Sequence, residues 1–199
     1  MARLTGSKAS ATRARIHESA MRLFADRGYR ATHVTDIAAA AGVSVRTIHV
    51  HYRSKEAIVF GDAETSIAEL ATQIATGKAA PLDAVHAWVT QGTSGWLEPD
   101  VQLQHELAEQ VPDVGHERTR LLTQLRDALA AGFAQEPGAP ADQLAPRMAA
   151  AAMVAALEHL ERVVITRVRD GRDVPPPDEL DAIIQSAYQF LTAGADALR

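Results

Sequence analysis

The sequence predicts an all-α protein of about nine helices, with a small basic N-terminal domain followed by a larger acidic helical domain. Apolar residues recur at spacings of three and four along most of the chain, and no segment alternates with the period of two expected of a half-buried strand. Residues 1–56 contain ten Lys/Arg and four Asp/Glu, a net of +6. The whole chain contains 20 Lys/Arg and 25 Asp/Glu, a net charge of −5, so the residues after 56 have a net charge of −11. This asymmetry is typical of a nucleic-acid-binding domain fused to a domain with another role.

Length and composition narrow the class of protein. A chain of 199 residues allows one or two domains with a sizeable core. It has no cysteine, which excludes disulfides and cysteine-based metal sites. The basic N-terminus lacks the apolar segment of a secretory signal, and no stretch approaches the roughly 18 apolar residues of a membrane span. We therefore expect a soluble cytoplasmic protein that does not enter a membrane.

The first helix is expected to support the segment that follows it. Residues 1–11 are small, polar and basic, and are expected to be mobile until they meet a partner. Thr12 is a candidate N-cap, and Gly28 is expected to end the helix. The apolar positions fall at i, i+4, i+7 and i+8: Ile16, Ala20, Leu23 and Phe24.

Residues 32–55 are predicted to form two short helices joined by a tight turn. The first lies around 35–41, Gly42 allows the turn, and Ser44 caps a second helix over 45–51. Ile48 and Tyr52 are expected to face inward. The residues left with outward options are Val45, Arg46, Thr47, His49, Val50 and His51. An inward Ile beside outward Arg, Thr and His is typical of the recognition helix of a helix-turn-helix, which lies in the DNA major groove.

The remaining helices are expected to build the second domain. Ser54 caps a continuous helix over 55–76, about 33 Å long, and further helices are expected from Pro81, over 101–110, around 121–133, over 145–169 and from Pro177. The run 148–157 is apolar all round and is expected to be buried on several sides. The last two helices are predicted to form half of a four-helix interface between two copies, with an intramolecular core helix as the alternative. The predicted domains are 1–53 and 54–199.

Residues 13–60 resemble the N-terminal pattern of the TetR family of bacterial transcriptional regulators. Besides the apolar positions of the first helix, the matching residues are Gly28-Tyr29, Thr32, Ile37-Ala38, Ala41-Gly42-Val43-Ser44, Thr47-Ile48, His51-Tyr52 and Ser54-Lys55-Glu56. The resemblance implies that Arg46, Thr47 and His49 face the operator, with Val45 and His51 beside them. It implies that Thr32, His33 and Ser44 approach the DNA backbone, and that Lys55 contacts a phosphate. The family usually has an aromatic residue, most often tyrosine, where this chain has His49.

The resemblance further implies a homodimeric repressor that a small-molecule ligand releases from a palindromic operator. For this to work, the ligand must bind one arrangement of the dimer better than the other. His49 and His51 add the hypothesis that DNA affinity depends on pH, because imidazole charges near neutrality. An operator affinity unchanged between pH 6 and pH 8 would overturn that hypothesis. A DNA-binding architectural protein without ligand control is the alternative.

Sites other than the DNA-binding site are weakly indicated. Candidates for a ligand pocket are large or polarizable residues of the second domain, each of which also fits a packing role: Trp88, Trp96, Leu103, His105, Phe133, Met153 and His159. His105, Glu106 and His116 match no metal-ligand spacing, so no metal or cofactor is predicted. Gly92 to Gly95 is not a nucleophile elbow and Gly77-Lys78 is not a phosphate loop, so no enzyme is predicted.

Overall fold

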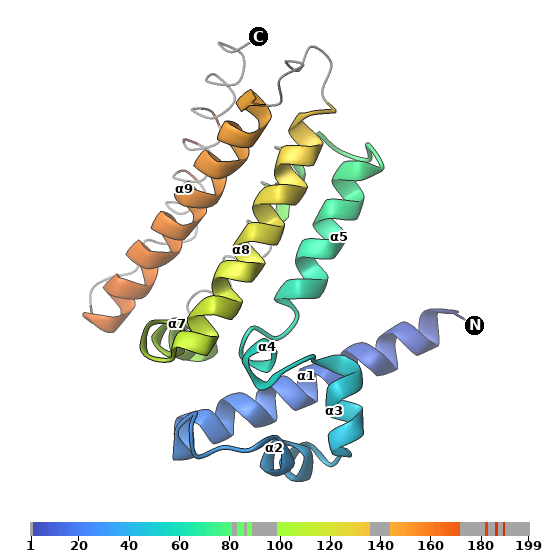
Figure 1. Cartoon of the computed structure of the whole chain (residues 1–199), viewed down its shortest axis with the longest axis vertical. Helices are drawn as coiled ribbons and strands as arrows, with labels where there is room; N and C mark the ends of the chain where they lie inside the picture. The colour runs from blue at the N-terminus through green and yellow to red at the C-terminus, as the bar shows by residue number, and fades with distance from the viewer. Residues whose placement is uncertain are drawn as a thin grey trace. The chain divides into compact units, whose positions relative to one another are not determined.

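The computed structural model describes residues 2–80, 83–85, 87–88, 99–135 and 144–171, together with 182, 186 and 189. Within these ranges the chain is helical and contains no strand, which confirms the all-α class (Figure 1). The helices are α1 (Ala2–Arg27), α2 (Val34–Ala41), α3 (Val45–His51), α4 (Lys55–Val59), α5 (Ala63–Ala75), α7 (Pro99–Gln110), α8 (Pro112–Phe133) and α9 (Leu144–Arg169). In this part of the chain, no helix is both long enough and apolar enough to cross a membrane.

The chain divides into two compact units. The head unit comprises Met1–Thr65 and Leu103–Arg120, and the body unit comprises Ser66–Gln102 and Leu121–Arg199. The helices α5, α7 and α8 therefore each contribute residues to both units. The predicted boundary after residue 53 stays a prediction.

The first helix is longer than expected. It begins at Ala2, so the prediction that Thr12 caps it and that residues 1–11 lie outside it is wrong. Residues 2–11 contain no proline, and six of these ten residues are alanine, arginine, leucine or lysine, which favour continuation of a helix. The helix ends at Arg27 as expected. There Gly28 takes a left-handed φ of 83° and its N–H donates to the carbonyl of Phe24 at 2.9 Å.

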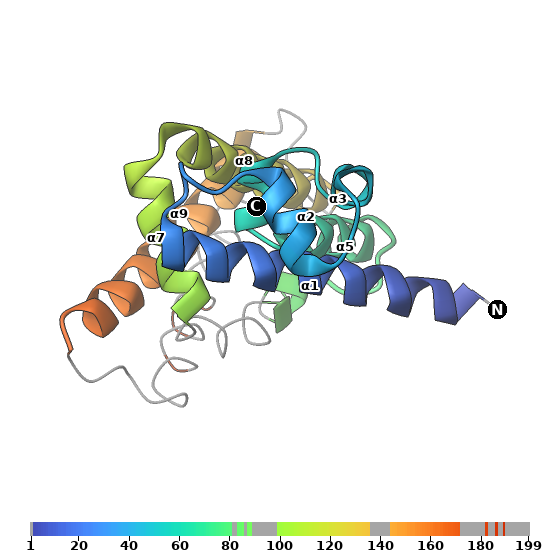
Figure 2. The same ribbon diagram turned by 90° about the horizontal axis from the view of Figure 1, so that it is seen from below.

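The helix-turn-helix forms as predicted, because its turn and caps are local. Gly42 ends α2 with a φ of 62°, and the hydroxyl of Ser44 accepts the Thr47 N–H at 3.0 Å at the start of α3. Ile48 and Tyr52 are buried, as expected, with exposed fractions of 1% and 2%. Figure 2 shows α2 and α3 beside α1. One side of α3 is therefore packed in the protein interior, and the opposite side is exposed to solvent.

One apolar core joins the elements of the head unit. It is built on α1, α2, α3 and α4, and it also includes Leu107 of α7 and Val114 of α8. Its largest buried side chains include Ile16, Met21, Ile37, Ile48, Ile58 and Val114. The recognition helix is therefore anchored by residues both near and far in the sequence.

The expected continuous helix over 55–76 is wrong, because the chain breaks into α4 and α5. At Gly61 the backbone adopts a left-handed φ of 53°, which an α-helix cannot continue through. A Cβ at Gly61 would lie 3.2 Å from Nδ1 of His17, so the position is tight as well as left-handed. The Gly61 carbonyl is turned to accept a hydrogen bond from Arg13 Nη2 at 3.0 Å. A contact with α1 thus compensates for the lost helical hydrogen bonds.

The later helices agree with the predictions in part. The helix expected around 121–133 begins at Pro112 instead, because Pro112 occupies a helix start rather than a stop. The prediction over 145–169 matches α9, with Pro146 in its first turn. Near Pro81, residues 83–85 and 87–88 are helical, and from Pro177 onward only 182, 186 and 189 are described, all helical.

Candidate nucleic-acid interface

The outward face of α3 combines one cation, one imidazole and one aliphatic side chain. Arg46, His49 and Val50 are exposed, and they occupy positions i, i+3 and i+4, which share one side of a helix. Val50 is 74% exposed. Of the other predicted contacts on this helix, Val45, Thr47 and His51 are partly buried. Sequence reasoning therefore placed Arg46 and His49 on the outward face but did not include Val50 in the site.

The start of α3 presents two hydroxyl groups held together. The Ser44 and Thr47 hydroxyl oxygens lie 2.8 Å apart, in addition to the bond between Ser44 Oγ and the Thr47 N–H. Ser44 is exposed and Thr47 is partly buried. Each hydroxyl retains further hydrogen-bonding capacity. The pair can therefore offer donors to DNA while it caps the helix.

Thr32 and His33 differ in what they offer to DNA. The Thr32 side chain is buried, with 1% exposed, and its hydroxyl donates to the Gly28 carbonyl at 2.9 Å. This hydroxyl is therefore not free for the DNA backbone contact that the resemblance implies. His33 is exposed at the N-cap of α2, where its backbone N–H donates to Asp36 Oδ2 at 2.8 Å. Its imidazole is therefore the group at this corner that faces solvent.

Lys55 anchors the loop that follows α1. Its ammonium donates to the carbonyls of Tyr29 and Thr32 at 2.9 and 3.0 Å. The same nitrogen lies 3.9 Å from the centroid of the Tyr29 ring, a cation–π distance. Burial lowers the pKa of Lys55, and the neighbouring Glu56 opposes that shift. Two of the three ammonium hydrogens are thus committed to the head unit, which leaves one for a phosphate.

Glu56 is held as a carboxylate beside this lysine. Tyr29 donates its hydroxyl to Glu56 Oε1 at 2.6 Å. Burial alone would raise the pKa of Glu56, but the hydrogen bonds from Tyr29, the backbone and Ser54, with the charge of Lys55, together bring it below its usual value. The pKa of Tyr29 is raised, mainly by burial and to a lesser extent by this hydrogen bond to Glu56. The folded head unit therefore favours the ionised form of Glu56.

This geometry predicts a pH-dependent effect of the substitution Glu56→Gln. A carboxylate whose pKa is lowered by folding stabilises the protein above its unfolded pKa, near 4.5, and loses that contribution as the pH falls through the folded value. We expect Glu56→Gln to lower the free energy of unfolding at pH 7 and the difference from wild type to shrink below about pH 4.5. Urea unfolding between pH 3 and pH 7 measures this difference. A difference that is constant with pH would contradict the prediction.

Arg13 is a functional candidate that sequence reasoning missed. Its guanidinium donates to the carbonyl of His51 at the end of α3 and to that of Gly61, and Nε lies 2.6 Å from Asp62 Oδ1. It also lies 4.3 Å from the Tyr52 ring centroid, while the Tyr52 hydroxyl donates to the Arg13 carbonyl at 3.1 Å. Arg13 thus fixes the end of α3 to α1 and to the turn between α4 and α5. Its partners lie 38 and 48 residues away, which no local pattern reveals.

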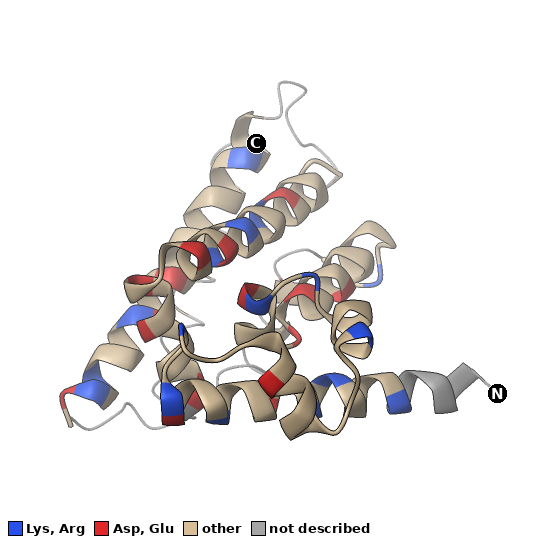
Figure 3. Cartoon of the chain, turned by 60° about the horizontal axis from the view of Figure 1, so that its bottom comes forward, with Lys and Arg blue, Asp and Glu red and all other residues tan. Residues whose placement is uncertain are grey.

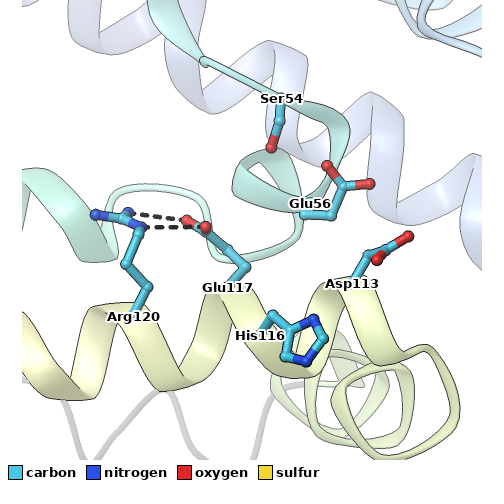
Figure 4. A pocket seen from close by; sticks show the side chains of 6 residues that line it. All are labelled: Ser54, Glu56, Asp113, His116, Glu117 and Arg120. Carbon is cyan, nitrogen blue, oxygen red and sulfur yellow. Dashed lines mark hydrogen bonds and ion pairs between the residues drawn. The ribbon is translucent and has the colours of Figure 1, made fainter.

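A second polar cluster lies elsewhere in the head unit. Glu117 of α8 is 8% exposed, and Arg120 reaches it with Nη2 at 2.9 Å and Nε at 3.1 Å. Arg53, two residues after α3, also bonds Glu117, and Glu64 lies 3.3 Å from Arg120. An open pocket of about 390 Å³ lies beside this cluster (Figure 4). Its lining residues are Ser54, Glu56, Asp113, His116, Glu117 and Arg120. Sequence reasoning singled out none of these ion pairs.

The predicted ligand residues that the structure describes are divided between the head unit and the body unit. Phe133 and Met153 are buried in the body unit, and the Trp88 indole donates to Ser66 Oγ at 2.6 Å. His159 is exposed on α9. Leu103 packs against the head core, and His105, also in the head unit, lies 3.3 Å from Glu109. Trp96 lies outside the described residues. No group of three or more metal-ligating side chains is gathered in the described ranges.

Most of the basic residues among residues 1–56 lie on helices of the head unit, whereas Arg30 and Arg53 lie between helices. Figure 3 shows Lys and Arg positions along α1 and on α3. Arg46 is exposed and Lys55 is only partly committed, so part of the positive charge excess predicted from composition stays available for DNA. Such an excess favours contact with the phosphate backbone whatever the base sequence.

Comparison with known proteins finds a match over the segment that contains α2 and α3. Residues 16–61 match the family model described as "Bacterial regulatory proteins, tetR family". The putative mycofactocin biosynthesis transcriptional regulator MftR of Mycobacterium tuberculosis is 43% identical over 65 residues, which are 33% of this chain and 33% of that protein. The chain thus matches about a third of the length of this curated relative.

Solved structures show that the likeness of fold extends over most of the chain. NalD, the secondary repressor of the MexAB-OprM multidrug efflux pump in Pseudomonas aeruginosa, has a TM-score of 0.58 at 18% identity, covering 91% of this chain and 96% of that one. The transcriptional regulator FadR from Bacillus subtilis in complex with stearoyl-CoA has a TM-score of 0.56 at 18% identity, covering 91% and 98%. At these identities the likeness concerns the fold.

Proposed function

We propose that this chain is a TetR-like transcriptional regulator, a homodimeric repressor released from a palindromic operator by a small molecule, because residues 16–61 match the model of that family. The observation that carries the proposal is the outward face of α3, set by an inward Ile48 and held at its end by Arg13. Such a helix presents side chains to base edges in the major groove. The proposal places the protein in the cytoplasm and assigns it no catalytic activity.

The proposed DNA contacts divide into base contacts and backbone contacts. Arg46 is assigned a guanine, because its guanidinium can bond O6 and N7 together. Thr47 and His49 contact neighbouring base edges, with Val45 and His51 at their margin. Backbone contacts are assigned to the following groups: the main chain at Thr32, the His33 imidazole, the Ser44 hydroxyl and the remaining N–H of Lys55.

The exposed side of α9 supports the dimer. Leu144 and Met148 are 59% and 57% exposed, although both are large and apolar. Ala151, Ala152 and Ala155 continue the same side one and two turns further on and are also exposed. Within one chain, the run 148–157 is buried at residues 150, 153 and 154 and exposed at residues 148, 151, 152 and 155. We assign this α9 stripe (residues 144, 148, 151, 152 and 155) to the second copy, because a reader of a palindrome is itself two-fold.

A charge placed in the α9 stripe is expected to break the dimer. Ala155→Arg would bury an unpaired cation in the interface, a cost of several kcal/mol, while leaving a monomer with the arginine in solvent. Sedimentation of the wild type and the variant measures the change from dimer to monomer. Gln73→Arg adds the same charge at an exposed position of α5 and should remain dimeric. A dimer that survives Ala155→Arg would move the interface to another surface.

The proposed ligand acts through a change in the arrangement of the dimer. A small molecule releases the operator only if it binds the DNA-free arrangement more tightly than the bound one. The apolar groups of the body unit suit an apolar ligand, since Phe133 and Met153 lie in its interior. The solved FadR complex with stearoyl-CoA has the same fold, so the fold is compatible with ligand binding.

Retention of genomic DNA tests the proposal as a whole. The purified protein is incubated with fragmented DNA of its source genome near physiological salt, and the retained fragments are sequenced. One or a few promoters that share an inverted repeat, with half-sites about one helical turn apart, would support the regulator. Retention spread over the genome and lost steeply as salt rises would mean mainly phosphate binding. The architectural DNA-binding protein would then replace the regulator.

A further inference from the structure

We propose that Val50 is a specificity-determining residue that contacts the C5-methyl group of a thymine in each operator half-site. This inference rests on the proposed function and deepens it, because it names a base that the recognition helix selects. It concerns a residue that the family resemblance did not place at the operator.

The exposure of Val50 is unusual for the head unit. Among the described residues, the large hydrophobic side chains that are exposed are Val50 at 74%, Leu144 at 59% and Met148 at 57%. The latter two belong to the α9 stripe, whereas Val50 lies on α3. A single exposed aliphatic residue is ordinary on a protein surface. Val50 matters here because it shares the outward face of the recognition helix with Arg46 and His49.

The major groove offers few partners to an aliphatic side chain. Base edges there carry hydrogen-bond donors and acceptors, and thymine adds a C5-methyl group. The Val50 side chain has two methyl groups and can form no hydrogen bond. If it faced a purine or an unmethylated cytosine, it would remove water from polar edges without replacing the lost hydrogen bonds. A thymine methyl therefore favours binding at this position, while the other bases oppose it.

The other residues of α3 are less suited to this contact. Val45 packs against the head core, and the Thr47 hydroxyl is engaged with Ser44. The imidazole of His49 is exposed but polar. Val50 is thus the apolar residue of α3 whose side chain is free to be covered by DNA.

Helix geometry indicates where the thymine should lie. Val50 follows Arg46 by four residues, which is about 6 Å along the helix axis at 1.5 Å per residue. Base pairs follow one another at about 3.4 Å. A helix lying along the groove therefore brings Val50 to a base pair about two steps from the guanine assigned to Arg46. This spacing makes the inference testable on the operator sequence.

The test removes the methyl from the DNA and the isopropyl group from the protein. Each thymine of the operator identified by genomic retention is replaced in turn by deoxyuridine, which lacks only the C5-methyl, and the dissociation constant is measured by fluorescence anisotropy. With the wild type, we expect one position per half-site, about two base pairs from the guanine assigned to Arg46, to lose about fourfold in affinity, which corresponds to one buried methyl.

The variant Val50→Ala isolates the contact. We expect it to bind the unmodified operator more weakly, with an unchanged melting temperature, and to be insensitive to deoxyuridine at that position. Losses at other thymines should persist, which serves as the internal control. Val50→Thr keeps one methyl and the shape of the side chain, and should retain part of the sensitivity.

Two outcomes would overturn the inference. One is an equal loss at that thymine in the wild type and Val50→Ala, and the other is an operator on which no deoxyuridine substitution matters. If the thymine is replaced by cytosine, 5-methylcytosine in the same place should restore much of the lost affinity, because it carries the C5-methyl group that Val50 contacts. If no specific operator is found at all, the proposed function fails, which is a separate result.

Discussion

Replacing Arg13 by alanine is expected to lower the melting temperature by roughly 5–15 °C, through a loss of about 2–4 kcal/mol. The side chain is largely buried, with 17% exposed, and it supplies hydrogen bonds to the carbonyls of His51 and Gly61. Without it, both carbonyls lose a charged donor and Tyr52 loses the guanidinium over its ring. Each loss is of order one to three kcal/mol, and the losses are not fully additive.

The same substitution is expected to weaken operator binding beyond what unfolding explains. His51 is the last residue of α3, and its carbonyl accepts a hydrogen bond from Arg13. Loss of this bond is expected to make the end of the recognition helix more mobile. Thermal unfolding followed by circular dichroism measures stability, and hydrogen exchange of the α3 amides measures local opening. Operator affinity is measured well below the melting temperature, where the variant is folded.

Two controls separate the roles of Arg13. Asp62→Asn removes only its ion pair, and because Asp62 is 55% exposed, the cost should stay below about 1 kcal/mol. Arg13→Lys keeps the charge but lacks the planar fork that reaches two carbonyls, so it should fall between alanine and wild type. If Arg13→Ala and Asp62→Asn were equally stable, the carbonyl contacts would contribute nothing and the positioning role would be excluded.

The features of the fold that the sequence predicted are those decided within a few residues. Gly42 and Ser44 define the turn and cap of the helix-turn-helix through bonds that span three to five positions. The break at Gly61 was missed, because the apolar spacing continues across it and a glycine inside a helix costs only about 1 kcal/mol. Its left-handed geometry is held by Arg13, 48 residues away. The start of α8 was missed for another reason, since Pro112 is compatible with both a stop and a start.

The candidate site was predictable in the same uneven way. Helix periodicity alone predicts that Ile48 faces inward while Arg46 and His49 face outward. The roles of Thr32 and Lys55 depend on carbonyls of the loop after α1, which a linear pattern does not show. Both side chains stabilise the loop that leads into α2. Sequence reasoning identified the helix that faces DNA, but not the contacts that hold it in place.

Replacing Arg46 by alanine should have the largest effect on sequence recognition. A bidentate contact with guanine is worth about 1–3 kcal/mol, or roughly 5- to 150-fold per half-site, and a dimer makes it twice. Arg46 is exposed, so its removal should leave the melting temperature unchanged. Affinity for every single-base variant of the operator, measured at one salt concentration, should show that discrimination disappears at one G·C pair in each half-site and persists at the others.

The salt dependence decides whether Arg46 reads a base or a phosphate. Loss of a phosphate contact weakens binding to all sequences alike and lowers the slope of log K against log salt by about one for each contact. Loss of a base contact changes specificity and leaves that slope nearly constant. Arg169→Ala removes an exposed arginine from the end of α9, in the body unit, and should change neither quantity. A uniform loss with a lower slope would assign Arg46 to the DNA backbone, and the recognised guanine would then need another partner on α3.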